Sequence, residues 1–236
     1  MSDNTTVVTD MAQVAEEIVK RDLPRWIAAS PSLRQRMLDS LRGMPPAARM
    51  TYEEFLVWAD GTHAEWVDGD IVIMSPVSIR HQQILGFIYK LLEMYVEHQE
   101  LGTVLPAPFQ MRLQNGREPD LLFVAARNLH RLRSTYLDGP ADLAVEIVSP
   151  ESIARDRGEK FYEYAEGGVP EYWLIDPQTQ WAEFYRLDGP HYRPAFAGDE
   201  GIYRSGVVPG FWLRVEWLWQ EPLPKTLVVL RELGVA

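Results

Sequence analysis

The stretches PDLLFV, residues 119–124, and LAVEIV, residues 143–148, decide the fold of this chain. Each is a short apolar run of the kind that forms a buried strand. Each also carries one carboxylate: Asp120 opens the first run, and Glu146 lies inside the second. A carboxylate in a core strand costs free energy unless another group pairs with it. The two runs therefore predict neighbouring strands that share a polar site.

A helix is predicted after the second run, from about Ser152 to Glu166, and two glycines end it. Helical spacing puts Asp156, Lys160 and Tyr164 on one face of this helix. Lys160 could then reach back over the end of the strand that carries the glutamate.

Two acids followed by a lysine can form a divalent-metal site that cuts phosphodiesters. Mg²⁺ binds through one or two carboxylates and keeps other positions for water and phosphate. It lowers the pKa of a bound water, and a nearby lysine can orient that water or stabilise negative charge on the phosphate. A second interpretation stays open, in which Asp120 caps a turn and Glu146 pairs with a core Arg or Lys.

The rest of the chain alternates helix and strand patterns, which predicts an α/β fold with a central mixed sheet flanked by helices. The sequence predicts a short helix to Ala59, a hairpin over 64–75 with its turn at Asp68-Gly69, a long helix over 79–99, strands near 103–104 and 109–113, a turn at Asn115-Gly116, a short helix near 128–131, and a hairpin of 171–176 with 181–187.

Composition narrows the function classes. The chain has 236 residues, no Cys and a net charge of −11. The absence of Cys excludes a disulfide scaffold and a thiol nucleophile and fits a cytoplasmic protein. No apolar run approaches the ~18 residues of a membrane span, and the first ten residues do not resemble a signal peptide. The acidic balance argues against a general nucleic-acid coat protein, so DNA binding would need a local basic surface, a metal or a partner.

Three parts are expected along the chain. Residues 1–46 carry two helical patterns and end at a Gly-Met-Pro-Pro break, which predicts an N-terminal helical extension. It could bind a partner, pack on a dimer mate or cap the main domain. Residues 47–220 form the main domain, and residues 221–236 form a C-terminal tail. The aromatic residues of the 171–187 hairpin are expected to pack in the core, and the tryptophans 212, 217 and 219 on the core or on a second subunit.

From Met50 to about Leu218 the chain resembles the Uma-two-type family of restriction endonucleases, a branch of the PD-(D/E)XK nuclease superfamily. The matching segments are Tyr52-Glu53-Glu54-Phe55, Glu65 with Asp68-Gly69-Asp70, Met74-Ser75-Pro76, His81, Pro119-Asp120, 145–150 (VEIVSP), Asp156, Lys160, Tyr164, 168–177 (GVPEYWLIDP) and Pro209-Gly210.

The resemblance implies a restriction-endonuclease-like core with a Mg²⁺ site, in which Mn²⁺ could replace Mg²⁺. Asp120 and Glu146 would be metal ligands. The superfamily's simple motif has Lys where this chain has Val148, so the resemblance is to members whose lysine lies on the following helix, here Lys160.

Two further residues are candidates. Glu65 matches an acid that the superfamily uses as another metal ligand, although it could equally be an exposed hairpin acid. His81 lies near the start of the long helix, where it could contact a phosphate or the acidic cluster, or form only a local hydrogen bond. Asp156 and Tyr164 are expected to support the substrate or the ligands.

Two functions follow as hypotheses. The first is a Mg²⁺-dependent DNA endonuclease, and two cuts on a duplex would suit a homodimer. In it, Glu65, Asp120 and Glu146 hold the metal and Lys160 assists the attacking water. The second is a catalytically silent protein that keeps the nuclease fold as a binding or assembly module.

Overall fold

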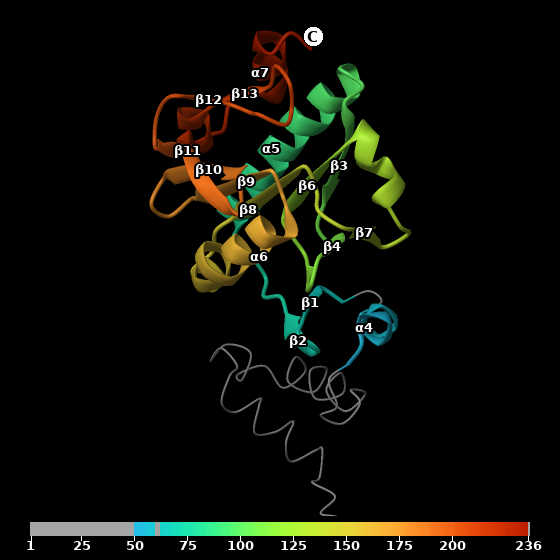
Figure 1. Ribbon diagram of the computed structural model, residues 1–236. Helices are drawn as coiled ribbons and strands as arrows, with labels where there is room; N and C mark the ends of the chain where they lie inside the picture. The colour runs from blue at the N-terminus through green and yellow to red at the C-terminus, as the bar shows by residue number, and fades with distance from the viewer. Residues whose placement is uncertain (1–49, 60–61, 236) are drawn as a thin grey trace, which may run out of the picture. The chain divides into compact units, whose positions relative to one another are not determined.

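The computed structural model describes residues 50–59 and 62–235 (Figure 1). The chain divides into two compact units, and the second, Tyr52–Ala236, contains all of the elements described below. The predicted helical extension over 1–46 lies outside the described residues.

A six-stranded mixed sheet forms the centre of this unit. Its strand order is β11-β10-β9-β8-β6-β3. β8 and β9 run parallel, whereas every other neighbouring pair is antiparallel. The strands are β3 (Gly102–Pro106), β6 (Leu121–Ala125), β8 (Leu143–Ile147), β9 (Glu171–Asp176), β10 (Trp181–Asp188) and β11 (His191–Gly198). The two runs that carry the acids are therefore neighbours, as predicted.

Period-two alternation divides the core into two apolar layers. Leu121, Phe123 and Val145 belong to the layer that includes the buried face of α5. Leu122, Ala144 and Val148 belong to the layer that includes α6. In Figure 1, α5 and α6 accordingly lie on opposite faces of the sheet. The α/β class and the mixed sheet flanked by helices are confirmed.

A second sheet has five short strands in the order β2-β1-β5-β4-β7. Its members are β1 (Ala64–Val67), β2 (Asp70–Ile73), β4 (Gln110–Arg112), β5 (Gly116–Arg117) and β7 (Tyr136–Asp138). The hairpin of β1 and β2 was predicted, including its turn, where Asp68 and Gly69 have positive φ. The sequence predicted one sheet and not this separate one, because β5 and β7 are too short to show a period. A further pair, β12 (Ile202–Arg204) with β13 (Trp212–Arg214), was also not predicted.

The helices are α4 (Tyr52–Trp58), α5 (Ile79–His98), α6 (Lys160–Gly167) and α7 (Thr226–Glu232), with 3₁₀ helices at Ala126–Arg131 and Val215–Trp219. α4, α5 and the 3₁₀ helix Ala126–Arg131 lie close to their predicted positions, whereas no helix was predicted at α7 or at Val215–Trp219. Ser78 caps α5 by accepting a hydrogen bond from the N–H of His81 at 3.1 Å. The predicted helix over 152–166 differs in detail, because a π-helical turn, Arg155–Glu159, precedes α6.

Several aromatic and C-terminal residues belong to the same core. Trp217 is buried and Trp212 packs beside it, and Trp173 packs edge-on against Phe184. Trp181, in contrast, remains 39% exposed, so its predicted core position is wrong. Beyond residue 220, α7 packs against α5 and contributes buried side chains to the first layer.

Candidate functional site

The strand register brings the two predicted acids to one end of β6 and β8. Leu121 pairs with Val145, so Asp120, which directly precedes β6, lies beside the segment after Glu146. The Asp120 Oδ2 atom accepts a hydrogen bond from the N–H of Ile147 at 2.7 Å. This bond fixes one carboxylate oxygen and leaves the other directed toward α5.

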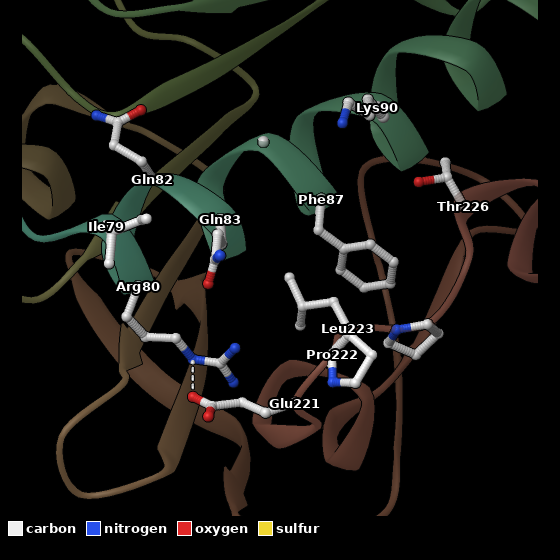
Figure 2. Close-up of a pocket in the computed structure, with 12 residues that line it drawn as sticks. Ile79, Arg80, Gln82, Gln83, Phe87, Lys90, Glu221, Pro222, Leu223 and Thr226 are labelled. Atoms are coloured by element: carbon white, nitrogen blue, oxygen red, sulfur yellow. Dashed lines mark ion pairs between the residues drawn. The ribbon is translucent and has the colours of Figure 1, made fainter.

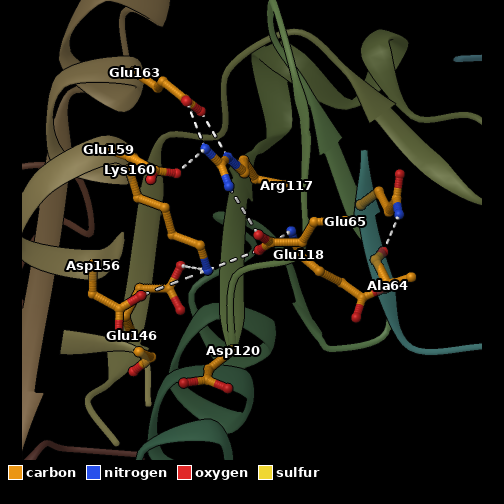
Figure 3. A network of polar contacts seen from close by, with 12 residues as sticks. Ala64, Glu65, Arg117, Glu118, Asp120, Glu146, Asp156, Glu159, Lys160 and Glu163 are labelled. Carbon is orange, nitrogen blue, oxygen red and sulfur yellow. Dashed lines mark hydrogen bonds and ion pairs between the residues drawn. The ribbon is translucent and has the colours of Figure 1, made fainter. Parts of the chain in front are cut away.

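Lys160 lies at the centre of the acidic cluster (Figure 3). Its Nζ atom lies 2.9 Å from Glu146 Oε1, 2.9 Å from Glu65 Oε1 and 3.7 Å from Asp156 Oδ1. The Tyr164 hydroxyl donates to the same Glu146 oxygen at 3.0 Å. Lys160, Asp156 and Tyr164 therefore lie on the face of the helix that is directed toward Glu146.

Glu65 is fully buried, and both of its carboxylate oxygens are engaged. Oε1 accepts from the Lys160 ammonium and from the N–H of Glu118 at 3.1 Å. Oε2 accepts from Arg117 Nη1 at 3.0 Å. Glu65 is therefore not an exposed hairpin acid, and its contacts place it deep in the network.

Arg117 is a site residue that the sequence reasoning missed. It is completely buried and forms a bidentate ion pair with Glu163. The distances are 2.7 Å from Nε to Oε2 and 2.6 Å from Nη2 to Oε1. Glu159 adds a third carboxylate, 3.1 Å from Nη2. The only signal in the sequence was a lone arginine three residues before Asp120. Arg117 ties the second sheet to α6, because it contacts Glu65 on β1 and Glu163 on α6.

The pKa values of the ionisable groups in this network shift in different directions. Burial alone would raise the pKa of Glu65, but Lys160 and Arg117 outweigh it and lower that pKa. Burial raises the pKa of Glu146 well above its ordinary value, because Lys160 offsets only part of the cost and Asp156 adds repulsion. Burial lowers the pKa of Lys160, yet Glu146 and Glu65 outweigh it and raise the value. The lysine is therefore charged, and Glu146 is easier to protonate than Glu65.

His81 joins the site from the start of α5. Its Nε2 atom lies 3.3 Å from Asp120 Oδ1. The side chain is buried, and neither ring nitrogen has a hydrogen-bond partner within the part of the chain that the structure describes. The predicted contact with the acidic cluster is present, whereas the local hydrogen bond at the helix start comes from the backbone of His81 and not from its ring.

Glu118 is a second residue that the sequence reasoning missed. Burial and the neighbouring Glu65 raise its pKa to about 7. His63 Nδ1 lies 3.5 Å from its Oε2 atom. No pattern marked Glu118, because it precedes the strand and its partners come from distant parts of the chain.

A small cavity and a larger groove meet at this cluster. The cavity, about 50 Å³, is lined by Asp120, Glu146, Asp156 and Lys160 but not by Glu65. The groove, about 580 Å³, reaches His81, Glu118 and Asp120 from the outside. We call it the α5 groove; its walls are His63, residues 74–77, the α5 residues 81, 82, 85, 86 and 89, Pro106, Ala107, Glu118 and Asp120.

The cavity has an excess of negative charge. Five carboxylates line it, from Glu118, Asp120, Glu146, Glu151 and Asp156, against the two cations Arg155 and Lys160. The Asp156 Oδ1 atom is buried without a hydrogen bond from any described residue. Oxygen donors with excess negative charge are what Mg²⁺ or Mn²⁺ prefers, so the donor set fits such an ion. The described residues nevertheless hold no ready-made metal-binding group of three or more His, Cys, Asp or Glu side chains.

Comparisons with known proteins agree with this architecture. The model of the Uma2 family, described as "Putative restriction endonuclease", matches residues 52–216. A crystal structure of "a putative nuclease belonging to DUF820" from Anabaena variabilis superposes with a TM-score of 0.63 at 18% identity, covering 72% of this chain and 97% of that one. No curated protein matches. None of the helices in the described ranges is long and apolar enough to cross a membrane.

Proposed function

This chain belongs to the Uma2 family, as its sequence predicted, and from that premise we propose that it is a metal-dependent DNA endonuclease. The observation that carries the proposal is the joint position of three groups. Asp120, Glu146 and Lys160 line one cavity, and the Lys160 Nζ atom lies 2.9 Å from Glu146 Oε1.

Asp120 and Glu146 are the residues that would hold Mg²⁺ or Mn²⁺. Two carboxylates suffice for such an ion, because phosphate and water complete its coordination. When bound, the ion would polarise the phosphate and lower the pKa of the attacking water. Asp156, one of whose buried oxygens accepts no hydrogen bond from the described residues, is a further acid of the cavity.

For Glu65 the contacts favour a positioning role over metal ligation. Its two oxygens are taken by Lys160, Arg117 and a backbone N–H. Glu65 holds the Lys160 ammonium from the side opposite the helix, and Arg117 in turn holds Glu65. Metal ligation by Glu65 remains a prediction that requires one of these contacts to open.

Lys160 and His81 are the groups that would act on the phosphate. An ammonium fixed beside the ligand Glu146 can stabilise negative charge as the phosphorus becomes pentacoordinate. His81 lies next to Asp120 and lines both the cavity and the α5 groove, so its ring can hydrogen-bond to a phosphate oxygen or to a water there.

A catalytically silent binding module is the alternative. It is favoured by the complete burial of Lys160 between two carboxylates and by the lack of a ready-made three-residue metal group among the described residues. The homodimer predicted for double-strand cutting is part of the endonuclease proposal, and size-exclusion chromatography with light scattering tests it.

Cleavage of supercoiled plasmid, with Mg²⁺ or Mn²⁺ and with EDTA, tests the endonuclease proposal. Wild type is compared with Asp120→Asn and with Asp188→Asn, a matched control at an exposed aspartate far along the chain. We expect metal-dependent cutting by wild type and by the control but not by Asp120→Asn. Absence of cutting together with absence of Mn²⁺ binding in calorimetry would favour the silent module.

A further inference from the structure

The α5 groove opens onto the same carboxylate that we assign to the metal. It has a volume of about 580 Å³ and shares His81, Glu118, Asp120 and the segment 74–77 with the small cavity. A group bound in the groove therefore lies next to the reacting phosphate.

The chemistry of its walls excludes a second phosphate. No Lys or Arg of the described chain lines the groove, and two acids, Glu118 and Asp120, lie at its inner end. A phosphate there would face like charges without a compensating cation. Met74, Leu85 and Pro106 supply apolar surface instead, which suits an uncharged ligand.

One aromatic side chain and one amide are placed to recognise a flat polar ring. Tyr89 lines the groove, and its hydroxyl donates to Glu93 Oε1 at 2.6 Å, which holds the ring in place. Gln82, exposed about two turns earlier on the same helix, can both donate and accept at the edge of a base. Stacking on an aromatic ring together with hydrogen bonds at a base edge is how proteins hold single-stranded nucleic acid.

His81 supplies an independent sign that something polar binds here. The side chain is only 4% exposed; its Nε2 atom lies 3.3 Å from Asp120 Oδ1, whereas its Nδ1 atom has no hydrogen-bond partner among the described residues. Buried polar groups are normally satisfied, and an exception requires an explanation. A ligand in the groove would provide the missing partner.

A second groove along α5 differs. It has a volume of about 550 Å³ and lies between the helix and the segment that leads to α7 (Figure 2). Gln82 and Gly86 line both grooves. Its walls carry Arg80, paired with Glu221 at 3.6 Å, and Lys90, which are cations that the α5 groove lacks. This groove does not reach Asp120, so it offers matched control positions on the same helix.

We propose that the α5 groove is a nucleobase subsite, which holds an unpaired base next to the scissile phosphate. The proposal rests on the proposed nuclease function and narrows its substrate to single-stranded or locally unpaired nucleic acid. Tyr89 stacks on the base, Gln82 contacts its edge, and His81 completes the inner wall.

Equilibrium binding tests the subsite without relying on cleavage. Fluorescently labelled single-stranded DNA, RNA of the same sequence and the matching DNA duplex are titrated with the full chain in Ca²⁺ alone, and their fluorescence anisotropy is followed. Wild type is compared with Tyr89→Leu and with Gln83→Leu, whose residue lines the second groove. Circular dichroism checks that both variants are folded.

We expect wild type to bind at least one single strand about tenfold more tightly than the duplex. Tyr89→Leu should weaken that binding by about ten- to a hundredfold, since a base stacked on an aromatic ring is worth that much. It should leave the duplex unaffected, and Gln83→Leu should change neither. The better bound of the two single strands identifies the source of the base.

Equal affinity for single strands and duplex, or equal effects of the two variants, would overturn the subsite. Metal-dependent plasmid cutting that Tyr89→Leu does not change would also overturn it, while the nuclease proposal survives. Selective single-strand binding that depends on Tyr89, without cutting of any substrate, would support the subsite and remove the nuclease proposal.

Discussion

The inner and outer halves of the acidic cluster are built differently. In the inner half, Lys160 lies between Glu65, Glu146 and Asp156, Arg117 pairs with Glu65, and every one of these groups is buried. In the outer half, Asp120 is 20% exposed at its side chain; its Oδ1 atom lies 3.3 Å from the ring of His81, and its Oδ2 atom accepts from the Ile147 N–H.

This difference indicates a division of labour. Buried charges that pair with one another set the positions of their neighbours, and removal of one partner leaves the other buried without compensation. A partly exposed carboxylate beside an unsatisfied histidine is free to bind something from outside. The inner half therefore supports stability and fixes the positions of Lys160 and of the ligand Glu146, whereas the outer half presents Asp120 and His81 to ligands that enter from outside.

Removal of the inner cation should produce the largest effect. Lys160→Met leaves the buried carboxylates without their common partner, so we expect a loss of about 3–5 kcal/mol in the free energy of unfolding. Urea unfolding followed by tryptophan fluorescence measures it. Lys90→Met, at an exposed α5 lysine, is the control and should stay within about 0.5 kcal/mol of wild type. A Lys160 variant as stable as this control would contradict the structural role of the inner half.

Removal of the outer carboxylate should affect activity more than stability. Asp120→Asn keeps an oxygen that can accept from the Ile147 N–H but loses the negative charge. Loss of a group that merely supports a metal ligand costs about ten- to a hundredfold, so loss of the ligand itself should lower the cleavage rate by at least about a hundredfold. The rate of plasmid nicking in Mn²⁺ and the melting temperature are measured together. A large drop in melting temperature with little change in rate would reverse the assignment of the two halves.

The pH dependence of stability should report the raised pKa of Glu118, a residue that lies between the two halves. Its pKa is raised from 4.5 to about 7 in the folded protein, so the folded state holds a proton that the unfolded state has already lost between these values. Its contribution to stability is present below pH 4.5 and is lost as pH rises to about 7, by roughly 2–3 kcal/mol. Glu118→Gln should therefore gain stability relative to wild type over this range, as urea unfolding at several pH values would reveal. A difference that does not change with pH would rule out the raised pKa.

The smallest effect is expected for a single neutral hydrogen bond in the inner half. Tyr164→Phe removes the hydroxyl that donates to Glu146 Oε1 at 3.0 Å, while Lys160 continues to pair with that oxygen. We expect a loss of about 1 kcal/mol of unfolding free energy and retained metal-dependent cutting. Tyr162→Phe, at an exposed position on the same helix, is the matched control. Complete loss of cutting in the Tyr164 variant would instead place this hydroxyl in the chemistry.

The sequence was sufficient for the strands that carry the acids and for the helix that carries the lysine. Apolar runs are local properties, so they predicted that Asp120 and Glu146 would lie on neighbouring strands and share a polar site. Helical spacing likewise predicted that Asp156, Lys160 and Tyr164 would share a face.

Partners that come from distant parts of the chain could not be predicted in this way. Arg117 meets Glu65 across 52 residues, and neither has a local pattern that names the other. The second sheet depends on the parallel pairing of β4 with β7, two strands of three residues each. The α5 groove arises where five separate segments meet, so no single stretch of sequence indicates it.

A crystal structure with Mn²⁺ would test the central claim most directly, because the anomalous signal of manganese locates the ion without ambiguity. We expect a peak in the small cavity, bound by Asp120 and Glu146, that is absent from Asp120→Asn crystals grown in the same way. A cavity without manganese at saturating concentration, with Lys160 still paired to Glu146, would contradict a metal-dependent nuclease site in this protein.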